Sequence, residues 1–161
     1  MLPKSSKLNK RNLYIFLIFS VFFFGAFLRF YKFKTNLFFE LDQSRDYRIV
    51  YEVLENGLKE LPLLGPRAGG TFFRLGPIYN YFQIAIAAVF GLSPVIIALP
   101  DLFFSILTIP LLFLFLRLYF PKEISLITTF LFSISLFAIE FSRFAWNPNS
   151  VPFFTLMCFY S

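Results

Sequence analysis

Long stretches of this chain carry no charged side chain, and this feature most constrains what it can fold into. Between Asn12 and Leu28 there is no Asp, Glu, Lys or Arg, and between Arg74 and Arg117 there is only Asp101. The 161 residues are 58% hydrophobic and 15% charged, whereas a water-soluble domain is usually about 25% charged. The composition therefore predicts an all-α polytopic membrane protein and excludes a disordered chain.

Four apolar segments are predicted to cross the membrane as helices, for which about 20 residues suffice. We expect these spans at about 12–30, 95–116, 124–141 and 151–161, the last of them cut short by the end of the sequence. The alternative for the first is a cleaved signal peptide, but the segment is long for one and lacks a small-residue cleavage site. We interpret it as an uncleaved span that follows a basic cytoplasmic N-terminus, residues 1–11.

The remaining charge is concentrated in a loop between the first two spans, residues 31–93, which we place on the outer face of the membrane. Residues 29–75 hold eight Lys or Arg and six Asp or Glu. Within this loop, apolar residues at helical spacing predict an amphipathic helix over about 43–56 that lies on the membrane surface. These residues are Ile49, Val50, Val53 and Leu54.

A second helix is predicted over about 77–90, and its position decides the topology. Apolar segments of about 10–14 residues more often lie at the interface than cross the bilayer. With this helix at the interface, the loop at 140–150 faces the same side as the loop at 31–93. If the helix crossed, the two loops would face opposite sides and their polar groups would not share a site.

Asp42 is the first candidate for a catalytic residue. It falls at the predicted N-cap of the 43–56 helix, so its simplest role is to cap that helix. The same position would hold a carboxylate in water just above the lipid, where a general base acting on an acceptor hydroxyl or amine is needed. The two roles are compatible. Asp46, one turn further on, belongs either to such a site or to an ion pair with a nearby arginine.

Four other side chains are candidates for binding. Arg67 and Arg74 suit the headgroup of a polyprenyl phosphate, because guanidinium groups match phosphate oxygens. Their alternative role is contact with ordinary lipid phosphates. Tyr79 is most simply an interfacial aromatic residue. Asp101 is a carboxylate inside a predicted span, and such a residue is a functional candidate by default.

The residue inventory narrows the chemistry. The chain has no His and one Cys, which excludes His-based zinc sites, Ser-His-Asp triads and Cys-rich metal sites. No cofactor is implied with certainty, although carboxylates alone would still bind a divalent metal. The net charge of +6 follows from membrane topology and forms no single basic face, so we expect membrane lipids and no nucleic acid as partners.

The order of these features resembles the N-terminal part of the GT-C membrane glycosyltransferases. The similarity covers about residues 10–161 and is greatest to the protein O-mannosyltransferase and aminoarabinose transferase-like group, glycosyltransferase family 39 and its bacterial relatives. It rests on a basic start, one span, an outer loop and three short motifs. The motifs are Asp42-Gln43-Ser44-Arg45, Gly76-Pro77-Ile78-Tyr79-Asn80-Tyr81 and Ser142-Arg143.

The resemblance implies a GT-C-like fold in which Asp42 is the base. The implied reaction is an inverting transfer of a sugar from a polyprenyl-phosphate donor to a lipid, glycan or protein acceptor. Arg45 follows the base as in the family, and Asp46 is an addition. Relatives often place Lys-Pro before the aromatic helix to contact the lipid phosphate. This chain has Gly76-Pro77 there, and Arg74 is the nearest substitute.

The resemblance also bears on the third span and on the whole protein. Relatives tend to have a second acidic residue after the arginine that matches Arg143. Here Asn147 and Asn149 follow, and these would serve hydrogen bonding or acceptor placement. Relatives are longer, so we expect an N-terminal fragment, inactive alone, from a multi-pass protein of a prokaryotic inner membrane. The alternative is a non-catalytic polytopic protein, either a transporter or flippase piece or an assembly subunit.

Overall fold

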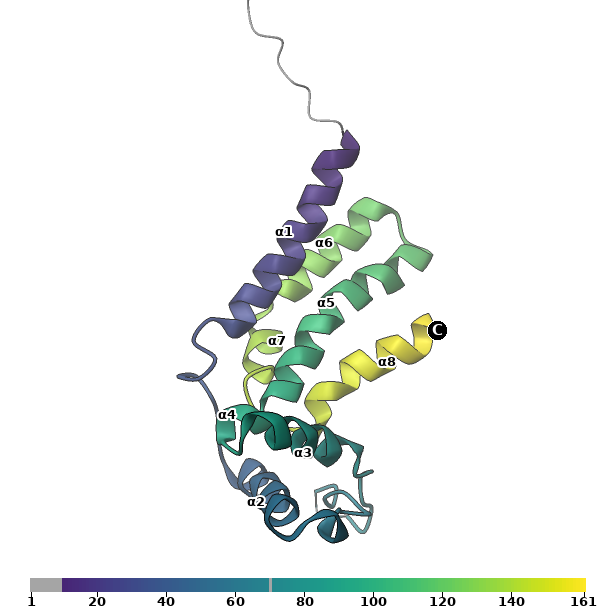
Figure 1. Cartoon of the computed structure of the whole chain (residues 1–161). Helices are drawn as coiled ribbons and strands as arrows, with labels where there is room; N and C mark the ends of the chain where they lie inside the picture. The colour runs from purple at the N-terminus through teal and green to yellow at the C-terminus, as the bar shows by residue number, and fades with distance from the viewer. Residues whose placement is uncertain (1–9, 70) are drawn as a thin grey trace, which may run out of the picture.

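In a computed structural model the protein is a bundle of helices with a smaller helical layer across one end. The structure describes residues 10–69 and 71–161, so residues 1–9 of the predicted N-terminal segment lie outside the described part. The helices that run side by side in Figure 1 are α1 (Lys10–Phe30), α5 (Leu99–Tyr119), α6 (Lys122–Ser133) and α8 (Val151–Tyr160). Helices α2 (Leu41–Asn56) and α3 (Ile78–Phe90) form the layer at the lower end, which we call the cap.

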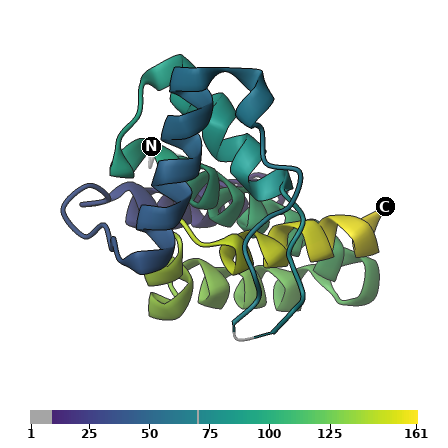
Figure 2. The same cartoon turned by 90° about the horizontal axis from the view of Figure 1, so that it is seen from below.

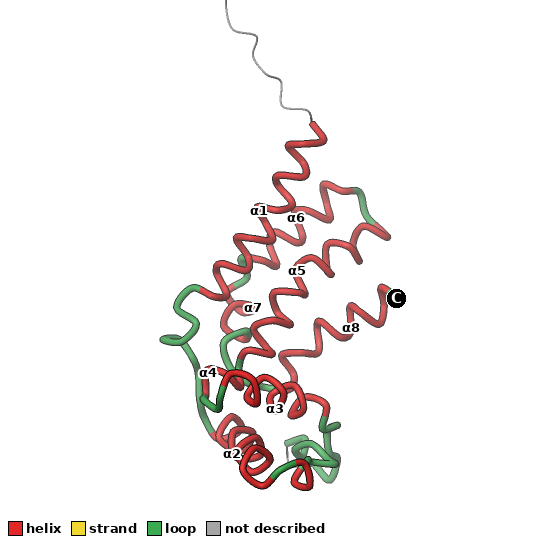
Figure 3. Tube along the Cα trace, in the orientation of Figure 1, coloured by secondary structure: helices red, strands yellow, loops and turns green. Residues whose placement is uncertain are grey.

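Short helices connect the longer ones. They are η1 (Leu58–Glu60), α4 (Pro94–Ile97), α7 (Leu136–Phe141) and η2 (Asn147–Ser150). Within residues 10–69 and 71–161 there is no β-strand, only an isolated bridge between Arg67 and Arg74. Figure 3 shows the same arrangement coloured by secondary structure. The predicted all-helical fold is confirmed.

Two helices of the described chain are long and apolar enough to cross a membrane, Lys10–Phe30 and Pro94–Tyr119, which joins α4 and α5. They match the spans predicted at 12–30 and 95–116. Helix α1 also exposes Phe16, Phe19 and Phe23. Such an apolar surface suits lipid contact.

The span predicted over 124–141 is wrong as a single helix. Helix α6 ends at Ser133, and α7 begins after Ser135, whose hydroxyl oxygen accepts a hydrogen bond from the Ala138 N–H at 3.4 Å. The carbonyl oxygen of Ser133, left free at the end of α6, accepts from Nη1 of Arg29 at 3.0 Å. Two serines, Ser133 and Ser135, flank the break within this otherwise apolar sequence, and polar groups satisfy both helix ends there.

Arg29 joins three helices of the bundle. Its side chain is fully buried. Besides Ser133 of α6, it donates from Nε to Oγ of Ser105 in α5 at 2.7 Å and from Nη1 to the Gly25 carbonyl in α1 at 3.0 Å. A buried charge is tolerated only when hydrogen-bonded, so these acceptors define where α1, α5 and α6 meet.

The cap is held to the bundle by an apolar core. Val50 and Val53 of α2 are buried, and they belong to one cluster with Ile84 and Ala87 of α3 and with Ile97 of α4. We predicted that the apolar stripe of this helix faces lipid. That prediction is wrong for Val50 and Val53, because α3 and α4 supply a complementary apolar surface.

The close contact of α1 with α5 and α6 makes Gly25 sensitive to substitution. A Cβ at this position would lie 2.6 Å from Cδ1 of Ile109 and 2.9 Å from Cβ of Ser133. Gly25→Val is expected to lower the free energy of unfolding by about 1–3 kcal/mol, because the helices must move apart. Thermal unfolding of the purified protein in detergent measures this. Gly76→Val is the control, because nothing lies within 4 Å of a Cβ there; equal losses in the two variants would contradict the packing argument.

Candidate functional site

Asp42 was predicted to be the N-cap of α2, and that prediction is wrong. It lies in the first turn of the helix. The N-cap is Glu40, whose N–H donates to Oε1 of Gln43 at 2.9 Å. A Gln three residues after the cap forms this reciprocal bond, which explains why the helix starts two residues earlier than expected. Asp42 is therefore free of a capping role, and its side chain is 53% exposed.

One guanidinium group lies between two carboxylates at the start of α2. Arg45 donates from Nη1 to Oδ1 of Asp42 at 2.7 Å, and from Nε and Nη2 to Oδ1 of Asp46 at 3.0 and 2.8 Å. Of the two alternatives for Asp46, the ion pair with a nearby arginine is the one observed. Asp46 is 2% exposed, whereas Asp42 faces solvent. Arg45 thus neutralises an inner carboxylate and orients an outer one.

Burial raises the pKa of Asp46 above its ordinary value of 3.8, although the hydrogen bond and the charge of Arg45 act in the opposite direction. The folded state therefore holds this proton more tightly than the unfolded state does.

An open hollow of about 440 Å³ lies beside Asp42. Its lining combines the start of α2 with the aromatic segment 141–146, and consists of Phe38, Glu40, Leu41, Asp42, Gln43, Phe141, Phe144 and Trp146. The ring centroids of Phe141 and Phe144 each lie 6.0 Å from that of Trp146. A carboxylate acceptor and aromatic rings in one hollow suit a ligand that has hydroxyl donors and an apolar ring face.

A side chain of α2 fixes the aromatic wall of this hollow. Gln43 donates from Nε2 to the carbonyl oxygen of Ala145 at 2.8 Å, and both residues are buried. The loop at 140–150 and the loop at 31–93 therefore meet at one end of the bundle, as a shared site requires. On which side of a membrane they lie, and whether 77–90 stays at its interface, remain predictions.

Behind the hollow, a buried carboxylate links the cap to the bundle. Oδ2 of Asp101 accepts a hydrogen bond from the Tyr79 hydroxyl at 2.5 Å and one from the Trp146 N–H at 3.3 Å. Tyr79 is buried, so the prediction of an interfacial aromatic is wrong. Its burial and the negative charge of Asp101 raise the pKa of Tyr79 well above 10.0. Oδ1 of Asp101 has no hydrogen-bond partner among the described residues.

Sequence reasoning assigned no role to the amides beside Tyr79. Asn80 donates from Nδ2 to Oε1 of Gln83 at 3.2 Å, and Gln83 donates from Nε2 to the Ile97 carbonyl at 3.4 Å. Both amide side chains are fully buried. A signal was present, because Tyr79, Asn80 and Gln83 share one face of an otherwise apolar helix.

Arg67 and Arg74 are placed apart from the hollow. They lie opposite each other in the isolated bridge of the loop between η1 and α3, and both are exposed. Neither lines the hollow beside Asp42.

The three predicted residues near the third span each take part in a hydrogen bond that involves a backbone carbonyl. Arg143 donates from Nη2 to the carbonyls of Leu28 and Tyr31 at 3.0 and 3.1 Å, so it binds the C-terminal end of α1. The carbonyl of Asn147 accepts from the Ser150 hydroxyl at 2.8 Å within η2. Asn149 donates to the Phe144 carbonyl at 3.0 Å. None of the three predicted residues lines the Asp42 hollow.

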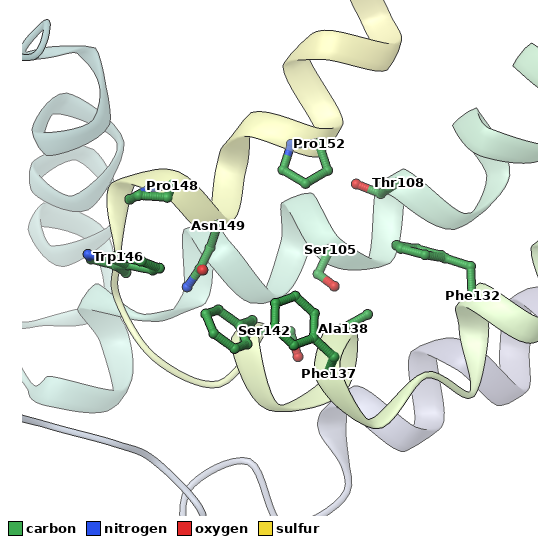
Figure 4. A pocket seen from close by; sticks show the side chains of 11 residues that line it. Ser105, Thr108, Phe132, Phe137, Ala138, Ser142, Trp146, Pro148, Asn149 and Pro152 are labelled. Carbon is green, nitrogen blue, oxygen red and sulfur yellow. The ribbon is translucent and has the colours of Figure 1, made fainter.

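Asn149 lines a second cavity of about 240 Å³ between α5, α7 and α8. Figure 4 shows its side chain beside Trp146, with Ser105 and Thr108 further along α5. Phe141 and Trp146 line both cavities, so the two cavities adjoin at these residues.

Within the described residues, no group of three or more His, Cys, Asp or Glu side chains is placed to hold a metal ion. No protein-family model, curated protein sequence or solved structure matches this chain.

Removing the Tyr79 hydroxyl should destabilise the fold through Asp101. Tyr79→Phe leaves the carboxylate without its strongest donor, and we expect a loss of about 1–3 kcal/mol in the free energy of unfolding. The same substitution in an Asp101→Asn background should cost less, because the charge that needs the donor is gone. Unfolding of the four proteins in detergent completes the cycle. Additive losses would show that the hydroxyl and the carboxylate do not act together.

Asp46 should make stability depend on pH. Because its pKa is raised in the folded state, its favourable contribution is complete at low pH and is lost as the pH rises from near 3.8 through the folded pKa. Asp46→Asn removes this loss, so the variant should gain stability relative to the wild type as the pH rises. Unfolding curves from about pH 4 to about pH 8 test this. Glu55→Gln, an exposed carboxylate of the same helix, is the control. Parallel pH curves for wild type and Asp46→Asn would contradict the assignment.

Proposed function

We propose that this chain supplies the N-terminal helices of a GT-C-like membrane glycosyltransferase that uses a polyprenyl-phosphate-linked sugar. In this proposal α1 and the α4–α5 segment cross the bilayer with α6, α7 and α8 packed beside them. The cap and the loop at 140–150 lie on the outer face. The transverse position of α3 at the end of the bundle in Figure 1 supports an interfacial placement of this helix.

The observation that carries the proposal is the hollow beside Asp42. Its lining places the Asp42 carboxylate, beside the N-cap residue Glu40, in one hollow with Phe141, Phe144 and Trp146. A pyranose has hydroxyl donors at its edge and C–H groups on its face, so it matches this combination of acceptors and rings. Only Asp42 of the two carboxylates is held by a guanidinium within the helix.

In the proposed reaction Asp42 is the general base. Its carboxylate takes the proton of an acceptor hydroxyl or amine, and the freed electron pair attacks the anomeric carbon of the donor sugar. The bond from that carbon to the phosphate oxygen breaks on the opposite face, its electron pair leaves with the lipid phosphate, and the anomeric configuration inverts. Arg45 acts as a positioning residue, because its bond to Oδ1 fixes the carboxylate while Asp46 holds the guanidinium from behind.

The lining of the hollow contains no Lys or Arg, so the lipid phosphate is expected to bind outside it. Arg67 and Arg74 remain the proposed phosphate contacts at this end of the protein, although they stand outside the hollow's lining. Asn147, Asn149 and Arg143 act on the site through the loop that carries Trp146. No step of the proposed reaction uses a metal ion.

Asp42→Asn tests the proposal. In the full-length protein reconstituted in lipid nanodiscs, sugar transfer from a polyprenyl-phosphate donor should fall by about 100-fold or more, because an amide accepts no proton. Glu52→Gln is the matched control, an exposed carboxylate of the same helix paired with Arg48, and it should keep the wild-type rate. Unchanged transfer by Asp42→Asn would overturn the catalytic assignment and favour a non-catalytic polytopic protein.

A further inference from the structure

We propose that the hairpin formed by residues 62–69 and 71–76 is a membrane-docking element that inserts its aromatic residues into the interface of an anionic lipid bilayer. The hairpin does not line the hollow beside Asp42. It shares Arg67 and Arg74 with the proposed donor contact, but its test measures no sugar transfer, so the two proposals can fail separately. This inference rests on the shape of the hairpin, on the side chains that it exposes and on its charge.

The hairpin has a defined backbone. The Gly65 N–H donates to the Leu75 carbonyl at 2.9 Å, the Leu75 N–H to the Pro66 carbonyl at 3.0 Å, and the Ala68 N–H to the Phe73 carbonyl at 3.0 Å. The Tyr81 hydroxyl donates to the Pro62 carbonyl at 2.8 Å and so ties the hairpin to α3. These hydrogen bonds therefore fix the backbone from which the side chains of the hairpin project.

The hairpin exposes large apolar side chains that a solvated loop would not need. Phe72 is 97% exposed and Phe73 is 66% exposed, while Leu63 and Leu64 are 85% and 59% exposed. Paired aromatic and aliphatic residues grouped on one short element mark an interaction site more often than a free surface. Aromatic side chains favour the headgroup level of a bilayer.

The charge of the hairpin selects the kind of partner. Residues 61–77 contain Arg67 and Arg74 and no Asp or Glu. The two arginines lie opposite each other across the isolated bridge, and like charges in that relation destabilise a pair unless an anion lies between them. Phosphate groups of an anionic bilayer supply that anion next to an apolar layer for the phenylalanines.

The position of the hairpin at the cap end of the bundle is where we expect the surface of a bilayer. The hairpin lies between η1 and α3, at the end of the bundle where Pro94–Tyr119, one of the two helices long enough to cross a membrane, contacts the cap. In Figure 2, which looks along the bundle from below, the two arms of the hairpin run across α8 to the edge of the molecule. An element that overhangs the bundle at this level faces lipid headgroups, so the bilayer is the occupant we assign.

A site-specific fluorophore tests this inference. In the full-length protein with Cys158→Ser, a single cysteine is introduced by Phe72→Cys and labelled with the environment-sensitive dye NBD. The protein is placed in nanodiscs of phosphatidylcholine with or without phosphatidylglycerol. Glu55→Cys, on an exposed position of α2, carries the dye in the control.

At position 72 we expect quenching by lipids with a doxyl group near the headgroup, and aqueous iodide quenching about threefold or more weaker than at position 55. Adding Arg67→Gln and Arg74→Gln should abolish the extra protection that phosphatidylglycerol gives. Equal iodide quenching at the two positions would overturn the inference. Protection from iodide without doxyl quenching would also overturn it, because protein, either another part of the chain or a second copy, would then cover the hairpin.

Discussion

The carboxylate of Asp101 is the constraint on which the arrangement of the site depends. A fully buried carboxylate is costly unless donors reach it. Its Oδ2 receives one donor from Tyr79 in the cap and one from the backbone of Trp146. Helix α5 therefore fixes α3 on one side and the aromatic wall of the hollow on the other. Moving either element would leave the carboxylate short of a donor, so the cap and the wall hold a constant relation to each other.

The rotation of α2 places Asp42 at the edge of this framework. Val50 and Val53 are buried in the cap core, and Asp46 lies one turn before Val50 on the same face. Asp42 lies one further turn toward the N-terminus, where this face leaves the protein interior and opens into the hollow. The apolar residues that anchor the helix thus also determine that one carboxylate of the pair is buried and the other is accessible. Arg45 completes the pair because its guanidinium spans the distance between the two turns.

The hydrophobic pattern predicted the helices of this fold better than it predicted the breaks and the contacts between them. The helices at 12–30, 43–56 and 77–90 were expected within two residues of their observed ends. The span at 95–116 lies within three residues of Pro94–Tyr119, which a turn divides into α4 and α5. The break in 124–141 was missed because it depends on Arg29, a residue distant in sequence. The start of α2 was misplaced because Glu40 and Gln43 form a reciprocal cap that competes with Asp42. Tyr79 was placed at an interface because its partner Asp101 lies on another helix, and no local pattern reports such a contact.

The segment from Ser133 to Trp146, which includes α7, is held by polar side chains from three other helices, and these bonds fix the position of its aromatic residues. Arg29 of α1 binds the carbonyl at its start. Gln43 of α2 and Asp101 of α5 bind the backbone of Ala145 and Trp146 near its end. All of these bonds go to backbone atoms, so they fix the path of the segment without using the rings that line the two cavities. The bonds that support the site are therefore separate from the surface that a ligand would contact. Substituting the rings of Phe141, Phe144 or Trp146 would change that surface and would leave these bonds, and the position of the segment relative to Asp42, in place.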